Sequence, residues 1–192
     1  MNALAGTVPP PPTPSLSGGW ALRPADPVTD LARVHAWLSA SGDTRSREGL
    51  QHELRTKAAG RATRPGIVSR DDVPVIYLEL HRVLHHVLRT CYPVGSHDLV
   101  LDLVTGSRGP AERGLVASLL PELASALFTA DPACRRITAA PDADDTVAVQ
   151  EFQNGGFRHV TEVDLPDRTV ALLVAERPEI TRISTALDDM PH

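Results

Sequence analysis

The chain has 192 residues, of which 42% are hydrophobic and 22% are charged, as in an ordinary globular protein with one domain and its own core. Its formal net charge of −5, without a basic run interleaved with aromatic residues, excludes a general attraction to nucleic acid or to an anionic membrane. Cys91 and Cys134 form neither a disulfide framework nor a Cys/His ligand pattern, and no apolar run is long enough to span a bilayer. We therefore expect a cytoplasmic protein that binds neither nucleic acid nor membrane.

The first half of the chain begins with a tract rich in proline, serine and glycine. Residues 1–19 lack the basic and apolar regions of a signal peptide, and their composition predicts an extended or disordered leader. Apolar residues from Leu31 to Leu38 then recur at helical spacing after Asp26 or Thr29, either of which can cap a helix. The elements expected in this half are a strand at 20–23, this helix, a weaker helix at 46–58, strands at 66–70 and 73–80, and a segment at 81–90 that either continues the strand or turns helical.

The second half is expected to contain the central strand and the longest helix. Residues 99–104 alternate leucine with valine or aspartate, as a central strand does. Apolar residues from Leu115 to Leu127 mark one face of a helix that starts at Gly114, and Pro121 is expected to bend it. The remaining elements are a loop at 106–114, a strand at 135–140, a helix at 144–154 stopped by two glycines, a hairpin of strands at 157–164 and 169–175, and a polar tail at 179–192. Strands alternating with helices predict one α/β or α+β domain over residues 20–178.

The order of these elements, with a glycine-containing loop before a long central helix, resembles that of the GNAT acyltransferase superfamily. Residues 76–177 resemble in more detail the hydroxylysine N-acyltransferases of hydroxamate siderophore assembly, especially the mycobactin branch. The segments that carry this resemblance are Tyr77-Leu78-Glu79-Leu80, His97-Asp98-Leu99, Arg113-Gly114, Leu119-Leu120-Pro121, Cys134-Arg135-Arg136-Ile137, Pro141-Asp142 and Gly156-Phe157. The resemblance implies the GNAT fold, a central mixed, mostly antiparallel, twisted sheet flanked by helices, and an acyltransferase activity.

The resemblance also implies a site for acyl-CoA as co-substrate, in a V-shaped opening between two central strands. The pyrophosphate of CoA would lie on backbone N–H groups at the start of the long helix, where unpaired amides and the helix dipole favour an anion. The residues implied are Leu103, Val104, Arg113, Gly114, Leu115 and Val116. The sequence departs from the family's Arg-Gly-x-Gly signature at Val116, and Glu112 adds negative charge beside the phosphates. A weakened or shifted CoA site and a helix start that holds no pyrophosphate both stay open.

The expected base also departs from the family pattern. Asp102 stands where the family has a histidine, and Asp142 matches the family's aspartate. An isolated aspartate is a weak base, but two carboxylates close together in a cleft would raise the pKa of one of them toward useful values. Alternatively, Asp142 belongs to a solvated helix start, where one of several carboxylates is the cap. His81 or His97 is the substitute base, because histidine titrates near neutral pH.

Further departures concern the acceptor, the leaving group and a metal. The family's tryptophan-containing segment corresponds to residues 39–50, which are polar and lack an aromatic side chain, so the acceptor stays open. Phe152 lies in the region where many GNAT enzymes have the tyrosine that protonates the departing thiolate, and phenylalanine has no proton to donate.

His81, His85 and His86 suggest metal ligands on a helix face, but no third ligand with convincing spacing follows, and we expect no metal.

Three functions stay open on the sequence. The first is an acyl-CoA-dependent N-acyltransferase that acts on an amine or hydroxylamine-type small molecule in siderophore or other specialised-metabolite biosynthesis. In it, Asp102 and Asp142 would orient or deprotonate the acceptor, His81 would line the cleft, and backbone amides of the central strand would hold the oxyanion. The second is a GNAT-fold enzyme repurposed to a CoA-independent reaction on a small metabolite, and the third is a non-catalytic binding subunit. A monomer or a homodimer is expected.

Overall fold

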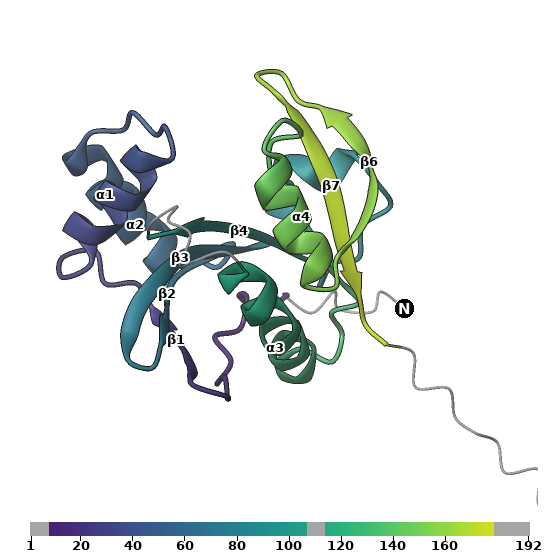
Figure 1. Cartoon of the computed structure of the whole chain (residues 1–192), viewed down its shortest axis with the longest axis horizontal. Coiled ribbons are helices and arrows are strands. Elements are labelled where there is room, and N and C mark those ends of the chain that lie inside the picture. Colours follow the sequence, from purple (N-terminus) through teal and green to yellow (C-terminus); the bar gives the residue numbers. More distant parts are fainter. Residues whose placement is uncertain (1–7, 107–113, 179–192) are drawn as a thin grey trace, which may run out of the picture.

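The computed structural model describes residues 8–106 and 114–178, which fold around one sheet (Figure 1). Within these residues lie seven strands and four α-helices. In chain order the elements are β1 (Trp20–Pro24), α1 (Leu31–Ala40), α2 (Arg47–Ala59), β2 (Thr63–Arg70), β3 (Val73–Arg82), the 3-10 turns η1 (Val83–His85) and η2 (Val87–Thr90), β4 (Leu99–Thr105), α3 (Leu115–Ala130), β5 (Arg136–Ala139), α4 (Thr146–Asn154), β6 (Arg158–Asp164) and β7 (Thr169–Glu176).

The sheet is split at its centre. Its strands are ordered β1-β2-β3-β4-β5-β7-β6, and every neighbouring pair is antiparallel except the parallel pair of β4 and β5. These two strands pair only over residues 99–100 and 137–138. Because β4 runs on to Thr105 whereas β5 ends at Ala139, the strands separate beyond this point. The mixed, mostly antiparallel sheet expected from the sequence is confirmed, and its central split is where a cleft opens.

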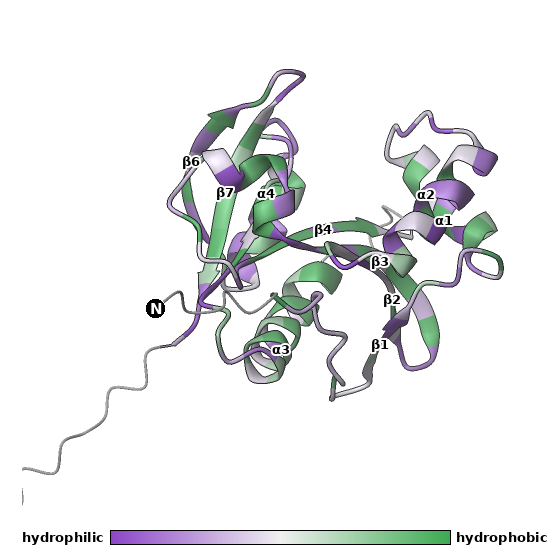
Figure 2. Cartoon of the chain, turned by 180° about the vertical axis from the view of Figure 1, so that it is seen from behind, coloured by the Kyte–Doolittle hydropathy of each residue, from purple (hydrophilic) through white to green (hydrophobic). Residues whose placement is uncertain are grey.

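Helices cover both faces of the central strands. Successive side chains of β3 point to opposite faces, so Ile76 and Leu78 join the main core with α3. On the other face, Tyr77 packs in a smaller core with Leu50 and Leu54 of α2. Figure 2 shows hydrophobic residues concentrated along α3 and β7, whereas α2 is mixed. The β3–β4 pair is therefore the wall between two packed layers, and its side chains reach both.

The structure settles one segment that the sequence left open and moves the start of one expected strand. β3 continues through Arg82 and is followed by two turns of 3-10 helix, so the segment left open at 81–90 is strand at its start and helical beyond. β2 begins at Thr63, earlier than expected, because residues 63–65 pair with residues 79–81 of β3. A pairing partner that is distant in the chain leaves no local signal, which explains the difference.

Residues 8–19 form neither helix nor strand, but they lie against the domain. Arg82, which is 3% exposed, donates a hydrogen bond from Nε to the Pro9 carbonyl (2.8 Å) and one from Nη2 to the Pro10 carbonyl (3.2 Å). Further along, Ser17 donates from its backbone N and its Oγ to Glu122 of α3, at 2.7 Å each. The part of the predicted leader that the structure describes is thus bound to the domain at both ends.

Glycines end α4 where the sequence predicts. The helix stops at Asn154, and Gly156 has a φ of 92°, in the region that favours glycine. A Cβ added at Gly155 would lie 2.6 Å from Leu120 Cδ1, so α4 packs closely on α3. The tail expected at 179–192 lies outside the described residues. In the part of the chain that the structure describes, no helix is long and apolar enough to cross a membrane.

Candidate active site

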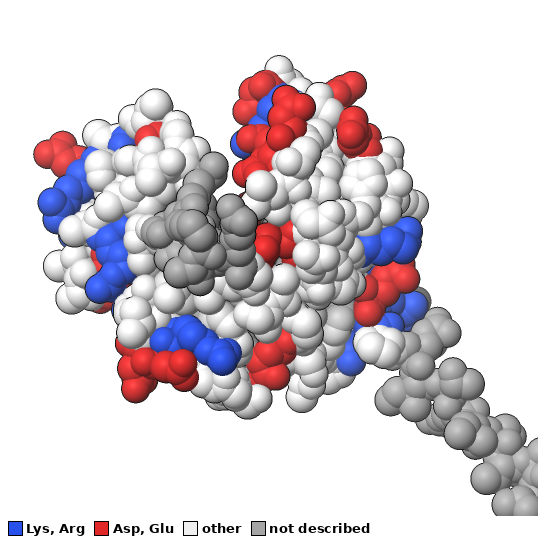
Figure 3. Space-filling model, in the orientation of Figure 1, with Lys and Arg blue, Asp and Glu red and all other residues white. Residues whose placement is uncertain are grey.

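A cleft of about 560 Å³ opens where β4 and β5 separate. Its described lining comes from residues 101–105 of β4, residues 140–142 after β5, and parts of α3 and α4. Figure 3 shows the hollow between the part of the molecule that carries α1 and α2 and the part that carries α4 and β7, with acidic side chains beside it. The charged residues of this lining are Asp102, Asp142, Asp145, Glu151 and Arg168. Acidic residues therefore outnumber basic ones in the described wall.

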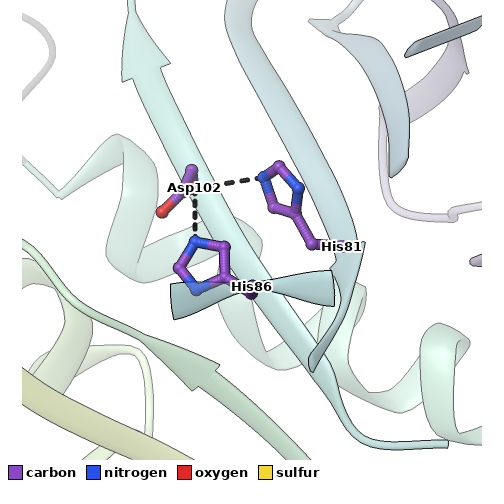
Figure 4. A group of neighbouring side chains, drawn as sticks. All are labelled: His81, His86 and Asp102. Carbon is purple, nitrogen blue, oxygen red and sulfur yellow. Dashed lines mark ion pairs between the residues drawn. The ribbon is translucent and has the colours of Figure 1, made fainter. Parts of the chain in front are cut away.

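Asp102 lies on β4 just beyond the last residues that pair with β5. The register of β3 and β4 places Glu79 opposite Asp102 and brings His81 to the diagonal position on the same face. His81 Nε2 lies 3.1 Å from Asp102 Oδ2, and His86 Nε2, from the turn between η1 and η2, lies 3.6 Å from the same oxygen (Figure 4). Two histidines thus face one carboxylate, which is 49% exposed and lines the cleft.

Backbone contacts assign the proton on one of these histidines. His86 Nδ1 accepts a hydrogen bond from the Leu88 N–H (3.3 Å), so a neutral His86 carries its proton on Nε2, the atom nearest Asp102. His81 Nδ1 lies 2.9 Å from Thr63 Oγ1, and His81 Nε2 is buried without a well-aligned hydrogen bond. His81 Nε2 is also 3.4 Å from Glu79 Oε2, so two carboxylates face that nitrogen.

The histidines determine the charge of Asp102. Removal from water would raise the pKa of the Asp102 carboxyl, since the carboxyl lies deep in the cleft although part of its surface is accessible from the cavity. The close contacts of His81 and His86 with the carboxylate, and their positive charge, outweigh this effect and hold the pKa of Asp102 below its ordinary value. Asp102 is therefore a carboxylate at neutral pH.

A second group of charges lies behind Asp102, on the side of α2. Glu79 accepts hydrogen bonds from Lys57 Nζ, at 2.8 and 2.6 Å, and from the Tyr77 hydroxyl. Burial, and then the neighbouring Glu79 carboxylate, raise the pKa of Tyr77, which stays protonated and donates. Lys57, Tyr77, Glu79 and Asp102 together line a smaller cavity of about 160 Å³. Alternation along β3 puts Tyr77, Glu79 and His81 on one face, whereas nothing in the sequence indicates Lys57.

Asp142 lines the same cleft with a different partner. Arg168 Nε lies 3.3 Å from Asp142 Oδ1, and the Asp142 side chain is 58% exposed. The cap of α4 is Asp145, whose Oδ1 accepts the Ala148 N–H (3.0 Å), so Asp142 is not the cap. Among the hydrogen bonds and ion pairs of the described residues, none joins Asp102 to Asp142. The expectation that carboxylate pairing raises a pKa is therefore wrong for Asp102, whose pKa is lowered by histidines instead.

The start of α3 is occupied by a side chain of α4. Gly114 precedes the helix with a φ of 81°, and its N–H donates to Glu151 Oε1 (2.7 Å). Glu151 Oε2 accepts the Ala117 N–H (3.0 Å). Nothing in the local pattern of α4 marks Glu151, because these partners lie 37 and 34 residues away in the chain. Glu151 is therefore a residue of the site that the sequence alone does not indicate.

Apart from Gly114, the residues predicted to bind CoA fall into three groups. Leu103 and Val104 line the cleft. Val116 also lines it, but its side chain is buried in the main core, against which Leu115 packs as well. Arg113 and the neighbouring Glu112 lie outside the described residues. These contacts, and the whole set of site residues, stay predictions.

Two other candidates have clear positions. His97 Nδ1 lies 3.0 Å from both carboxylate oxygens of Asp131, and neither residue lines the cleft, so His97 is not placed to act on a substrate there. Phe152 does line the cleft, and its ring packs edge to face on Phe157 with centroids 5.3 Å apart. Of the two substitute bases, only His81 lies beside Asp102.

His81, His86 and Asp102 also have the chemistry of a metal site. Their donor atoms lie within 4.8 Å of one another, whereas His85 is exposed and outside this group. A ligating imidazole needs a free lone pair on the ligating nitrogen, but the Leu88 N–H at Nδ1 leaves the proton of neutral His86 on Nε2. The geometry thus favours hydrogen bonding to Asp102 over coordination, and the expectation of no metal stays a prediction.

Comparisons with known proteins agree with the fold. Residues 26–165 match the family described as "Acetyltransferase (GNAT) domain". The chain is 30% identical over 176 residues to the lysine N-acyltransferase MbtK of Mycobacterium sp. (strain MCS), which covers 88% of this chain and 72% of that protein. It is 25% identical over 167 residues to the N(6)-hydroxylysine O-acetyltransferase of Escherichia coli, covering 82% of this chain and 52% of that protein. The structure of the aminoglycoside acetyltransferase AAC(6')-Ib in complex with coenzyme A has a TM-score of 0.72 at 22% identity, over 82% of this chain and 95% of that one, and this likeness supports the fold. The family match spans most of the length of this chain. The chain therefore belongs to the GNAT acetyltransferase family.

Proposed function

We propose that the chain is an acyl-CoA-dependent N-acyltransferase whose acceptor is an amine or hydroxylamine of a small molecule in siderophore or other specialised-metabolite biosynthesis. One observation carries the proposal: the Asp102 carboxyl group, with His81 and His86 beside it, lies on the cleft wall where β4 and β5 separate. Relatives named for lysine and N(6)-hydroxylysine support the acceptor class. Asp102, Asp142 and His81 are the proposed site residues, and a cytoplasmic monomer or homodimer is the proposed working form.

The charge of the wall favours an acceptor that carries N–H donors. Asp102 stays ionised because its pKa is lowered, so it accepts hydrogen bonds from a bound nitrogen and orients the lone pair of that nitrogen. The same lowering makes Asp102 a weak base. A hydroxylamine nitrogen is much less basic than an alkylamine and is already neutral near pH 7. Asp102 therefore suits a hydroxylamine-type acceptor better than an alkylammonium group.

The proposed reaction needs a weak base only after attack. The acceptor nitrogen attacks the thioester carbonyl carbon, so that a C–N bond forms and the carbonyl electrons move to oxygen. Nitrogen in this adduct is strongly acidic, and the Asp102 carboxylate accepts its proton. The C–S bond then breaks, and the departing thiolate takes a proton from water, because Phe152 at the cleft wall has none to give. Backbone N–H groups of β4 beyond residue 100, where β5 no longer pairs, are the proposed donors to the oxyanion.

Calorimetry with acetyl-, succinyl- and longer acyl-CoA thioesters tests the proposal. Binding of at least one thioester is expected, followed by acyl transfer to a hydroxylamine such as N(6)-hydroxylysine. Asp102→Asn and Asp142→Asn should each lower turnover with little change in thioester affinity. If the folded protein binds none of these thioesters, the proposal is wrong.

A second candidate function follows from the negative charge of the cleft wall. The acidic lining and the Glu151 carboxylate at the start of α3 favour a small cationic metabolite and oppose an anionic donor. This candidate is a GNAT-fold protein that binds or converts such a metabolite without CoA. Binding of a small diamine or hydroxylamine by folded protein that binds no thioester would select it.

A further inference from the structure

We propose that Glu151 is a built-in competitor for the donor, whose carboxylate occupies the backbone amides at the start of α3 until the pyrophosphate of CoA displaces it. This inference rests on the proposed function, because it concerns how acyl-CoA enters the same cleft. It assigns to Glu151 a control over donor affinity that is separate from the chemistry at Asp102.

The contact has the geometry of a shared helix cap. In a capping box, the residue before the helix caps the third helical N–H with its own side chain, and a glutamate at the third position returns the bond. Gly114 has no side chain with which to do this. Glu151 supplies both bonds instead, since one carboxylate oxygen accepts the Gly114 N–H and the other accepts the Ala117 N–H.

The close packing of the two helices keeps this carboxylate in place. Gly155 lets the end of α4 approach Leu120 on α3, because any Cβ there would lie 2.6 Å from Leu120 Cδ1. Figure 1 shows α4 beside α3. Glu151 itself is half-buried, between the start of α3 and the cleft that it lines. The carboxylate therefore occupies this position as a consequence of the fold and not of a freely moving surface side chain.

The Gly114 and Ala117 N–H groups cannot bind the Glu151 carboxylate and a pyrophosphate at the same time. The N-terminal amides and dipole of a helix favour negative charge, but an anion placed on the Gly114 and Ala117 N–H groups would lie within a few ångströms of the Glu151 carboxylate that already accepts from them. Among the described residues of the cleft wall, Arg168 is the one cation, and it is paired with Asp142. No described cation of the wall is thus left to offset Glu151 when a pyrophosphate arrives. The carboxylate must leave these amides before CoA can use them.

Free CoA and pantetheine separate this role from a structural one. Pantetheine has the thiol arm of CoA but no pyrophosphate, so Glu151 should not affect its affinity. In calorimetric titrations, Glu151→Gln is expected to bind CoA about tenfold more tightly than the wild type, with unchanged pantetheine affinity. A purely structural cap would lower the melting temperature without tightening CoA binding. Glu162→Gln, an exposed change of the same charge on β6, should leave both affinities unchanged.

The outcomes also separate this inference from the function on which it rests. Equal CoA affinity in the wild type and in Glu151→Gln, or weaker affinity in the variant, overturns the competitor role and leaves the acyltransferase proposal in place. CoA binding by both proteins, weaker in the wild type than in Glu151→Gln and with equal pantetheine affinity, supports the inference. Absence of CoA binding by both proteins, with each shown to be folded, overturns both proposals together.

Discussion

Asp102 and Glu151, on different sides of β4, have different kinds of partner. On the side of α2, Asp102 and Glu79 have cationic or proton-donating partners in His81, His86 and Lys57. On the side of α4, Glu151 has no side-chain cation among its described contacts and is satisfied by backbone N–H groups of α3. The first arrangement keeps a carboxylate charged and available to a substrate. The second uses a carboxylate to fill a position that suits an anionic ligand.

Under the proposed function, this difference would let one cleft bind the acceptor and the donor through separate carboxylates. A bound acceptor would meet a carboxylate whose neighbours already balance its charge, so binding requires little rearrangement. An anionic donor would meet a carboxylate that must first be displaced. The variants below test each side by itself, in order of expected effect.

Asp102→Asn should give the largest effect. The amide keeps the shape of the side chain but loses the charge and the ability to accept a proton, so turnover should fall by about 10²- to 10⁴-fold. Thioester affinity should change little, because Asp102 belongs to the acceptor side. Steady-state kinetics with calorimetry checks both quantities, and Asp72→Asn, in the turn between β2 and β3, is the matched control. An unchanged rate would remove Asp102 from the mechanism.

His86→Gln should shift a pH profile with a smaller loss of rate. The histidines lower the folded-state pKa of Asp102, so its ionised form contributes stability above the ordinary pKa of an aspartate, and this contribution is lost as the pH falls through the lowered value. Without His86 the pKa of Asp102 should rise, and the acidic limb of the rate profile should move to higher pH. The exposed neighbour His85→Gln is the control. A limb that stays in place would show that His86 does not set the charge of Asp102.

Gly155→Ala tests the packing on which the donor side depends. The new methyl group would lie 2.6 Å from Leu120 Cδ1 and 2.7 Å from Leu120 Cβ, so the helices must move apart. Overpacking of this kind costs about 1–3 kcal/mol in the free energy of unfolding. Urea denaturation measures the loss. Stability equal to that of the wild type would mean that α4 can leave α3 without cost.

Metal addition should have the smallest effect. A neutral His86 that keeps its proton on Nε2 offers no lone pair there, so Zn²⁺ and Ni²⁺ should give no stoichiometric binding heat and a chelator should leave turnover unchanged. One metal ion bound per chain, and lost in His86→Ala, would contradict the proton assignment.

The sequence could predict positions that depend on alternation and local caps. The pattern of residues 99–104 places Asp102 on a central strand, and the polar run after residue 140 indicates a helix start, which Asp145 caps. It could not predict the lowered pKa of Asp102, because that depends on how the turn after β3 brings His86 beside β4. Glu151 was equally hidden, since its partners become neighbours only when α4 packs on α3.

The contact between Arg82 and the proline-rich leader has a practical consequence for anyone who shortens this protein. A proline carbonyl accepts hydrogen bonds while its nitrogen donates none, so consecutive prolines present only acceptors to a guanidinium that has only donors. Arg82 follows His81 directly on β3, and the carbonyls of Pro9 and Pro10 satisfy part of its buried head group. Trimming the tract as dispensable would leave those donors without partners directly beside His81, which contacts Asp102. Recombinant versions intended for enzymology should therefore begin ahead of residue 9, even though the composition of the proline-rich tract resembles that of a linker.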